Sequence, residues 1–589
     1  MRGIKRHLAA LTSTLLTLSL CLGLLVSPAA HAAAAPAGGQ GYNDKNARQD
    51  KVSSDLRGSM GKKKGSDRAQ VIVQISGKPS GPLNALLKRN GVRVKKDFVN
   101  LKMLTVELPL SAVEELASFR EVTYVSADRE VISFGGHLST TTGADAVRQQ
   151  TTSAGADYTL DGTGVGIAFL DSGLYSAHKA FTGRIGWSKD YTGENVTEDP
   201  YGHGTHVAGI AAGSGSIHGG KYVGIAPNAT IHNLRVLNSK GTGTVSSVLA
   251  ALNELLLSHS YYKIRVVNMS LGMPAVDSYK NDPVCVAVRR LVDAGVVVVA
   301  AAGNDGKDKT NGKLYGLIHA PGNEPSAITV GATNTSGTID RGDDLVATYS
   351  SRGPTRSYWT DEAGVVHHDN LLKPDLVAPG NKIVAAQAVN NLIVKSDPSL
   401  DVGASKFANQ KMMRLNGTSM ATPVAAGAAA LLLQVNPKLT PNMVKMILMY
   451  TAQPLPGFNT LEQGAGQLNI EGAVRLAKAM RTDIGAGTAV GAPLLTSSTP
   501  PAAVTTISYQ EGNSRRRQST SFTWSQGVIL DYTYATGAEL ITKYQAIYGS
   551  GVLLGDGVLL GDGVLLGDSV KMSTGVLLGD HILTRDGSP

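Results

Sequence analysis

The stretch VVVVAAAGN, residues 296–304, begins with seven consecutive apolar residues, four of them valine. It shows no alternation of apolar and polar side chains, which indicates a strand that is buried on both faces. Comparable runs are VGIAFLD (165–171), TIHNLRVL (230–237) and IRVVNMSLG (264–272). Segments with helical patterns separate these runs, at 203–213, 246–260 and 283–295. The alternation predicts an α/β domain with a mainly parallel sheet and helices on both faces.

The N-terminus has the layout of a secretory signal. The basic start MRGIKRH is followed by an apolar run over 8–26 and then by the small residues SPAAHAA. A membrane anchor is the alternative, and the small residues after the apolar run argue against it. No later segment has the roughly 18 uninterrupted apolar residues of a membrane span. We therefore expect a signal peptide over 1–32, a secreted, extracellular protein, and no membrane span once the signal is removed.

Charge and cysteine content argue against nucleic acid binding and against an intrachain disulfide. The formal net charge is +9, but residues 138–589 carry equal numbers of basic and acidic side chains, so the excess lies in the first 137 residues. Without a basic stripe in the large remainder, the sequence gives no case for nucleic acid binding. Cys21 lies inside the expected signal, which leaves Cys285 without a partner for a disulfide. Core packing, bound ions or a high unfolding barrier must then stabilise the folded protein.

Two regions flank the expected α/β domain. A polar, Lys-rich linker at 33–68 precedes a regular pattern of strands and helices over 69–137, which predicts a small α+β unit. Its place between a signal and a large body favours a pro-segment over a free-standing binding module. The tail at 483–589 is rich in Ser, Thr and Gly and contains four copies of GVLLGD. Four copies are marginal for a β-helix, so we expect a weakly ordered or self-associating tail.

Three motifs carry the chemistry: FLDSGL with Asp171, YGHGTHVAG with His203 and NGTSMATP with Ser419. In this order they resemble the signature motifs of the subtilisin-like serine peptidases. VNMSLG, AAAGN, SSRGP and KPDLVAPG also resemble segments of that family. The resemblance implies a catalytic domain over 138–482. It also implies that 69–137 is similar to the family's inhibitor-like propeptide, with a ferredoxin-like α+β fold.

The resemblance assigns roles to four residues, and the chemistry explains each. A serine hydroxyl is a poor nucleophile at neutral pH, so Ser419 needs His203 to take its proton. Asp171 would orient that imidazole and stabilise its charged form. In the family, the oxyanion is held by a side-chain amide and by the nucleophile's own N–H at a helix start. Asn304 and Ser419 match those two positions.

Each residue also has a simpler interpretation. Ser419 alone would be a helix cap, and Asp171 or Asn304 alone would be a turn residue. His203 and His206 are three apart on an expected helix and could share a metal ion. No Glu lies between them as a zinc peptidase requires, so we interpret His206 as structural. The metal ligands of this chain, if any, stay unknown.

Substrate binding is also inferred from the resemblance. An extended peptide would pair with Ser270-Leu271-Gly272, and the primary pocket would lie between that strand and Ala301-Ala302-Gly303. The pocket base falls in LIHAPGN (317–323), which has no carboxylate, so we expect no strict preference for basic residues. Backbone pairing implies broad specificity. We expect His319 and Ala320 to shape the base, with medium to large uncharged side chains preferred.

The main hypothesis is a secreted serine endopeptidase of broad specificity, made as a zymogen and self-cleaved between about residues 131 and 142. Its partners would be protein or peptide substrates and its own propeptide, which would act as intramolecular chaperone and inhibitor. The chemistry requires no cofactor; a structural calcium ion stays open, with no assignable ligands. The alternative is an inactive subtilase-like scaffold that binds proteins or surfaces through its repeat tail.

Overall fold

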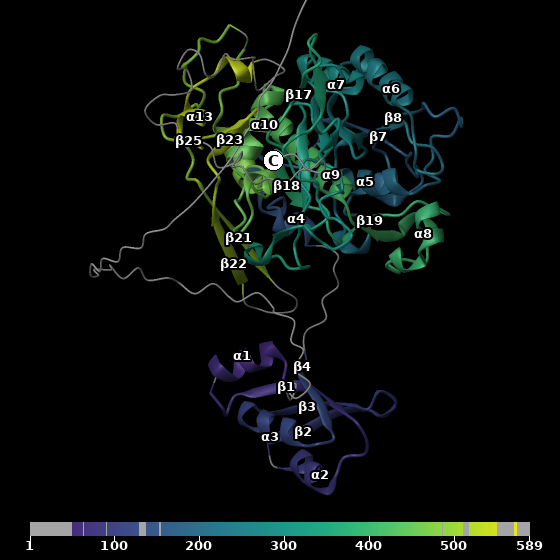
Figure 1. The fold of residues 1–589 in the computed structure, drawn as a ribbon, viewed down its shortest axis with the longest axis vertical. Helices are drawn as coiled ribbons and strands as arrows, with labels where there is room; N and C mark the ends of the chain where they lie inside the picture. The colour runs from purple at the N-terminus through teal and green to yellow at the C-terminus, as the bar shows by residue number, and fades with distance from the viewer. Residues whose placement is uncertain are drawn as a thin grey trace, which may run out of the picture. The chain divides into compact units, whose positions relative to one another are not determined.

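A computed structural model describes residues 50–549, apart from 63, 90, 129–136, 152–154, 486 and 511–516, together with 571–573. The expected signal peptide, half of the expected cleavage window (131–136) and the GVLLGD repeats lie outside these residues. The chain divides into two compact units, an N-terminal unit of residues 1–131 and a C-terminal unit of residues 132–589. Figure 1 shows the elements of both units, which are described separately.

The N-terminal unit is a small α+β fold. Its elements are α1 (Ser54–Lys62), β1 (Arg68–Ile75), α2 (Gly81–Lys88), β2 (Arg93–Phe98), β3 (Met103–Pro109), α3 (Val113–Ser118) and β4 (Val122–Ala127). The sheet is antiparallel with the order β2-β3-β1-β4. Alternate residues of β1, Val71 and Val73, face the core, where α2 and α3 cover them. From β1 to β4 this is the β-α-β-β-α-β connectivity of ferredoxin-like units.

The ordered part of this unit starts earlier than the sequence predicted. Residues 50–62 belong to the expected polar linker, yet Leu56 is buried in the core and Val52 forms a parallel bridge with Val125. Ser53 N–H also donates to the Val125 carbonyl at 3.0 Å. A few apolar residues therefore fold a segment whose overall composition is polar.

The C-terminal unit is built on a mainly parallel sheet, as predicted. Its order is β15-β14-β12-β10-β7-β9-β8, with β18 also paired to β14, and only β15 is antiparallel to its neighbour. The strands are β7 (Gly166–Asp171), β8 (Ile185–Asp190), β9 (Thr230–Arg235), β10 (Ile264–Met269), β12 (Val297–Ala301), β14 (Ile328–Asn334), β15 (Leu345–Val346) and β18 (Leu376–Pro379).

Helices cover both faces of this sheet. α5 (His203–Ala212) and α9 (Thr418–Val435) pack into one core, whereas α6 (Val245–Ser258) and α7 (Pro283–Asp293) pack into the other. Along β12, Val297 and Val299 face the first core, and Val298 and Ala300 face the second. This explains the absence of alternation in VVVVAAAGN. Among the described residues, α9 alone is long and apolar enough to cross a membrane, and 83% of it is buried inside the protein.

The C-terminal unit contains further helices and paired strands. The remaining helices are α4 (Leu138–Thr141), α8 (Leu392–Ser396), α10 (Pro441–Tyr450), α11 (Thr460–Gln463), α12 (Ile470–Ala479) and α13 (Glu539–Thr542). Paired strands are β5 (Gln149–Thr151) with β6 (Asp157–Thr159), β11 (Met273–Pro274) with β13 (His319–Ala320), β16 (Tyr358–Thr360) with β17 (Val366–His368), and β19 (Ile383–Ala386) with β20 (Met412–Leu415).

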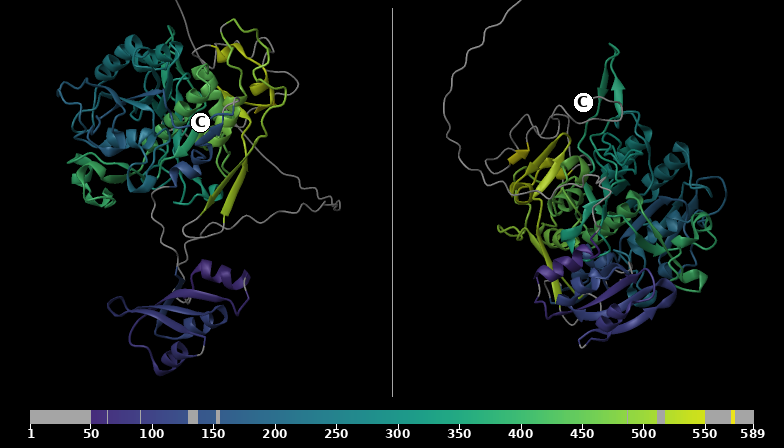
Figure 2. Two further views of the ribbon diagram at one scale, coloured as in Figure 1. Left: turned by 180° about the vertical axis from the view of Figure 1, so that it is seen from behind. Right: turned by 60° about the horizontal axis from the view of Figure 1, so that its bottom comes forward.

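The segment from 493 to 549 differs from the expected weakly ordered tail. It forms the hairpin β21 (Val504–Gln510) and β22 (Arg517–Thr523) and the strands β23 (Gly527–Leu530) and β24 (Thr533–Thr536), with β25 (Lys571–Ser573) beside β24. Trp524 and Tyr548 are buried in the same core as α9 and α10. Asn442 also donates to the Ile547 carbonyl at 2.6 Å. Figure 2 shows this segment, in yellow-green, along one side of the C-terminal unit.

Candidate active site

The predicted catalytic residues lie at the ends of three elements of the C-terminal unit. Asp171 is the last residue of β7, His203 the first of α5, and Ser419 the second of α9. Ser419 is hydrogen-bonded to Ser270, and Ser270 lines the same cleft as His203. The structure therefore brings these side chains to one region at the carboxyl ends of the parallel strands, where such sheets place their sites.

Asp171 and His203 form a close pair. The Nδ1–H of His203 donates to Oδ1 of Asp171 at 2.7 Å, and the Asp171 side chain is only 1% exposed. Gly204, next to His203, permits close packing of α5 on the end of β7, since a Cβ on it would lie 2.3 Å from the Gly173 carbonyl oxygen and 3.1 Å from Cβ of Asp171. Burial opposes protonation of His203, but the charge of Asp171, their hydrogen bond and the charge of Asp199 outweigh it and raise the pKa of His203. The imidazole is thus held as a base that can stabilise a proton.

A second buried carboxylate holds the start of α5. Asp199 accepts hydrogen bonds from the N–H groups of Gly202 at 2.7 Å and Thr205 at 2.8 Å, and from the Ser172 hydroxyl at 2.8 Å. Burial raises the pKa of Asp199, although these hydrogen bonds oppose the shift. Asp199 thereby fixes the helix end that carries His203. This role was not predicted from the sequence, where its only signal is an acidic residue just ahead of an expected helix start.

His206 has the structural role expected of it. It is fully buried, and its Nε2–H lies 3.1 Å from the carbonyl oxygens of both Ile383 and Met413. Burial, with a smaller effect of His203, lowers the pKa of His206 to about 3, so it is neutral at ordinary pH. Its bonds tie α5 to β19 and β20. Within the part of the chain that the structure describes, no three His, Cys, Asp or Glu side chains form a group that could hold a metal ion.

Ser419 is held at the start of α9 by a reciprocal contact with Ser270. The Ser419 hydroxyl donates to the Ser270 carbonyl at 3.0 Å, and the Ser270 hydroxyl donates to the Ser419 carbonyl at 2.8 Å. Asn268, at the end of β10, donates to the Ser270 hydroxyl at 2.9 Å and orients it. The Ser419 hydroxyl thus lies beside the strand that was predicted to bind substrate.

Asn304 lies beside the same helix start. Its Oδ1 accepts from the Thr418 N–H at 2.9 Å and lies 3.1 Å from the Thr418 hydroxyl, which fixes the orientation of the amide. A Cβ on Gly417 would be 3.6 Å from both the Asn304 Nδ2 and the Ser419 N. Gly417 has φ of 148°, where residues with a side chain are strained. Two N–H donors therefore border one space that the missing side chain leaves open.

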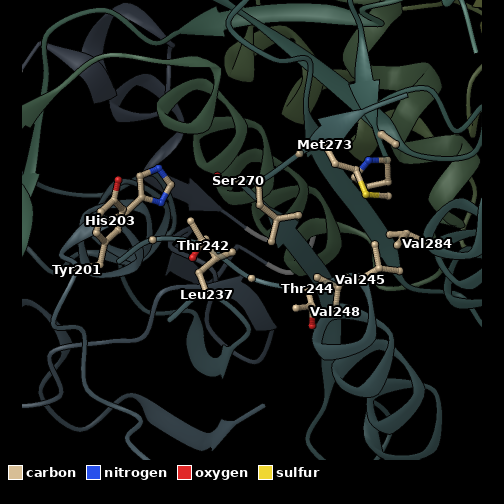
Figure 3. Close-up of a pocket in the computed structure, with 16 residues that line it drawn as sticks. Tyr201, His203, Leu237, Thr242, Thr244, Val245, Val248, Ser270, Met273 and Val284 are labelled. Atoms are coloured by element: carbon tan, nitrogen blue, oxygen red, sulfur yellow. The ribbon is translucent and has the colours of Figure 1, made fainter. Parts of the chain in front are cut away.

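A cleft of about 560 Å³ runs past this region. Figure 3 shows Tyr201 and His203 at one end, Met273 and Val284 at the other, and Ser270 between them. Of the six predicted substrate-binding residues, Ser270, Leu271 and Gly272 line the cleft, but Ala301, Ala302 and Gly303 do not. The facing wall is residues 241–245, with Val248 behind it. This wall was not predicted from the sequence, because it carries no motif beyond a run of Gly and Thr.

A buried carboxylate bonded to an imidazole, with a serine at the start of a buried helix beside the same cleft, is the arrangement of a serine-type endopeptidase. Comparisons with known proteins agree with this class. A model of the Subtilase family matches residues 162–473, more than half of the chain. The chain belongs to the subtilase family, and it is a serine-type endopeptidase.

Three relatives of the chain support the same assignment. The chain is 35% identical over 398 residues to the serine protease AprX of Bacillus subtilis strain 168, covering 66% of this chain and 83% of that protein. It is 34% identical over 368 residues to the extracellular serine proteinase of Thermus sp. strain Rt41A, covering 62% and 74%. It is 30% identical over 405 residues to subtilisin E of Bacillus subtilis, covering 68% and 88%.

Proposed function

We propose that this subtilase is a secreted endopeptidase of broad specificity that uses Asp171, His203 and Ser419 as a catalytic triad. The observation that carries the proposal is the 2.7 Å bond from His203 to the buried Asp171, on elements that both contact α9, the helix whose second residue is Ser419. The chemistry proposed below uses these side chains and water and needs no cofactor.

The first step requires a rotation of Ser419. Its hydroxyl now donates to the Ser270 carbonyl, so it must turn about Cα–Cβ to donate to Nε2 of His203 instead. His203 then takes the proton as Ser419 attacks the substrate carbonyl, and Asp171 stabilises the imidazolium. The proton passes to the departing amine, which leaves an acyl-enzyme. A water molecule, activated by the same imidazole, hydrolyses that ester.

Asn304 would stabilise the tetrahedral oxyanion together with the Ser419 N–H. Support comes from the space beside Gly417, which both donors border at 3.6 Å from the Cβ that glycine lacks. Because Thr418 holds the Oδ1 of Asn304, the Nδ2 group needs no reorganisation when charge develops. The pair of donors thus acts on the transition state more than on the bound substrate.

The cleft supports binding of an extended peptide chain. Its backbone would pair with Ser270-Leu271-Gly272, and main-chain pairing accepts many sequences. At the end away from His203, Val245, Val248, Met273 and Val284 would receive an apolar side chain of the substrate. We therefore propose unfolded or extended segments of proteins as substrates.

The N-terminal unit would serve as a propeptide, chaperone and inhibitor. Support comes from its separate core and its place ahead of the peptidase domain. The extracellular serine proteinase of Thermus sp., a relative, supports secretion of such a precursor. A large parallel sheet has many non-local contacts and folds slowly, so a small local fold could template it. We expect Ser419→Ala to accumulate as a precursor and active enzyme to begin between about residues 131 and 142. An active protein that retains the N-terminal unit would identify it as a permanent domain.

One assay tests the activity itself. Purified, processed protein should cleave casein and be labelled by a fluorophosphonate at Ser419, as located by peptide mass spectrometry. Ser419→Ala is the matched control, refolded with the N-terminal unit supplied separately and expected to be inert to both. A folded wild-type protein that shows neither reaction would instead be the inactive scaffold, and the triad assignment would be wrong.

A further inference from the structure

We propose that His319, anchored by Asp305, fills the floor of the primary specificity pocket and restricts the enzyme to small residues on the acyl side of the cleaved bond. The proposal rests on the function proposed above and names the substrate class of that site. It replaces the expectation from sequence that medium to large side chains are preferred.

The first observation is that the imidazole lies between two glycines. A Cβ on Gly272 would be 3.0 Å from Cβ and 3.2 Å from Nδ1 of His319, and a Cβ on Gly303 would be 2.8 Å from its Cδ2. These glycines belong to the two segments between which the primary pocket was predicted. A slot that glycines leave open on both sides would normally receive a substrate side chain, but here the ring of His319 occupies it.

The second observation is that the ring cannot easily withdraw. Nε2 of His319 pairs with Oδ2 of Asp305 at 2.7 Å, and the Asp305 N–H donates to the Ser351 hydroxyl at 3.0 Å. The His319 N–H donates to the Ala302 carbonyl at 3.0 Å, and its strand β13 pairs with β11 opposite Pro274. Bonds to the ring and to the backbone therefore fix the side chain from both sides.

The position of the ring decides which substrate residue it affects. The attacked carbonyl must lie beside Ser419 and point its oxygen at Asn304. The residue that supplies this carbonyl would then place its side chain between the segments 270–272 and 301–303, because its backbone pairs with the first of them. His319 takes up the depth of that space, so alanine or serine fits and an aromatic ring would clash.

The test uses tetrapeptide p-nitroanilides that differ only in the residue before the cleaved bond. Wild type should favour alanine over phenylalanine by at least tenfold in kcat/KM. His319→Gly should raise kcat/KM for phenylalanine by at least about 10–200-fold, the range for the fit of a single methylene, while alanine changes little. Asp305→Ala, which frees the ring, should give a smaller gain in the same direction. Titration with a fluorophosphonate counts folded, active enzyme in each sample.

His367→Ala is the matched control, because His367 pairs with Asp361 at 2.8 Å on the β16–β17 hairpin, outside the residues lining the cleft. It should leave the ratio of the two substrates unchanged. A wild-type preference for phenylalanine, or an unchanged ratio in His319→Gly, would overturn the pocket proposal while the activity stands. A protein that cleaves no substrate and takes no label would overturn the proposed function and this proposal together.

Discussion

Asn304→Ala separates transition-state stabilisation from substrate binding. The change removes the Nδ2 donor that borders the space beside Gly417. Loss of one such donor costs about 2.7–4 kcal/mol of barrier, so kcat should fall by about 10²–10³ with KM nearly unchanged. Alanine also removes the acceptor of the Thr418 N–H, an effect like loss of a helix cap, which costs about 0.5–2 kcal/mol of unfolding free energy. The kinetic loss should therefore exceed what the loss of stability explains.

Asn304→Asp distinguishes the two effects, because its carboxylate still accepts from Thr418 but offers no donor to the oxyanion. We expect near wild-type thermal unfolding and a fall in kcat at least as large as that of Asn304→Ala. Asn253→Ala, on an exposed position of α6, is the control and should leave both constants unchanged. Kinetics with a peptide nitroanilide at titrated enzyme concentration give kcat and KM separately. A change confined to KM, or a fall in kcat below tenfold, would refute the oxyanion assignment.

Three further outcomes follow from buried groups, measured on inactive Ser419→Ala protein wherever stability is the readout. Burial lowers the pKa of His206 to about 3 in the folded protein, whereas an unfolded His has a pKa of about 6.5. Between these two values His206 is protonated only in the unfolded chain. The free energy of unfolding should therefore fall by about 2 kcal/mol between pH 6.5 and 4.5. In urea titrations at several pH values, His206→Gln should reduce this loss of stability at low pH. An unchanged pH dependence would contradict the assignment to His206. Trp524→Ala should cost about 3–5 kcal/mol in the same titrations if the C-terminal segment is part of the core. Gly417→Ala, in otherwise wild-type enzyme, should lower kcat by about tenfold or more because its methyl group enters the space of the oxyanion; unchanged kcat would exclude that placement.

The main sheet could be predicted because its physical cause is local in sequence. A strand that faces a core on each side, as β12 does with Val297 and Val298, must be apolar throughout, and that pattern is visible without a structure. Composition gave wrong predictions for segments in which a few apolar residues determine whether the segment folds. Leu56 orders a Lys-rich segment, and Trp524 anchors a segment rich in Ser and Thr. Averages over such windows hide single apolar residues that reach a core formed elsewhere in the chain.

The residues of the active site also fall into those that the sequence predicted and those that it did not. Asp171, His203 and Ser419 could be predicted because the motifs around them, FLDSGL, YGHGTHVAG and NGTSMATP, resemble those of the subtilisin-like peptidases. Asp199 was missed because its task is to bind backbone N–H groups, which leaves no pattern in the side chains it serves. The cleft wall at 241–245 was missed because only the folded chain brings it opposite Ser270.

The C-terminal segment completes the body of the peptidase, and α10 shows why. All ten residues of this helix, Pro441–Tyr450, are buried, including Asn442 and Lys445. A helix that is buried around its whole circumference needs cover on every side. The main sheet and α12 supply part of this cover, and β23 with residues 546–548 supplies the rest. A chain that ended at 482 would expose this apolar face, so residues up to 549 belong to the folding unit of the enzyme. Cys285 is buried and free of any disulfide in the part of the chain that the structure describes, so this packing does the stabilising work that a disulfide does in other proteins.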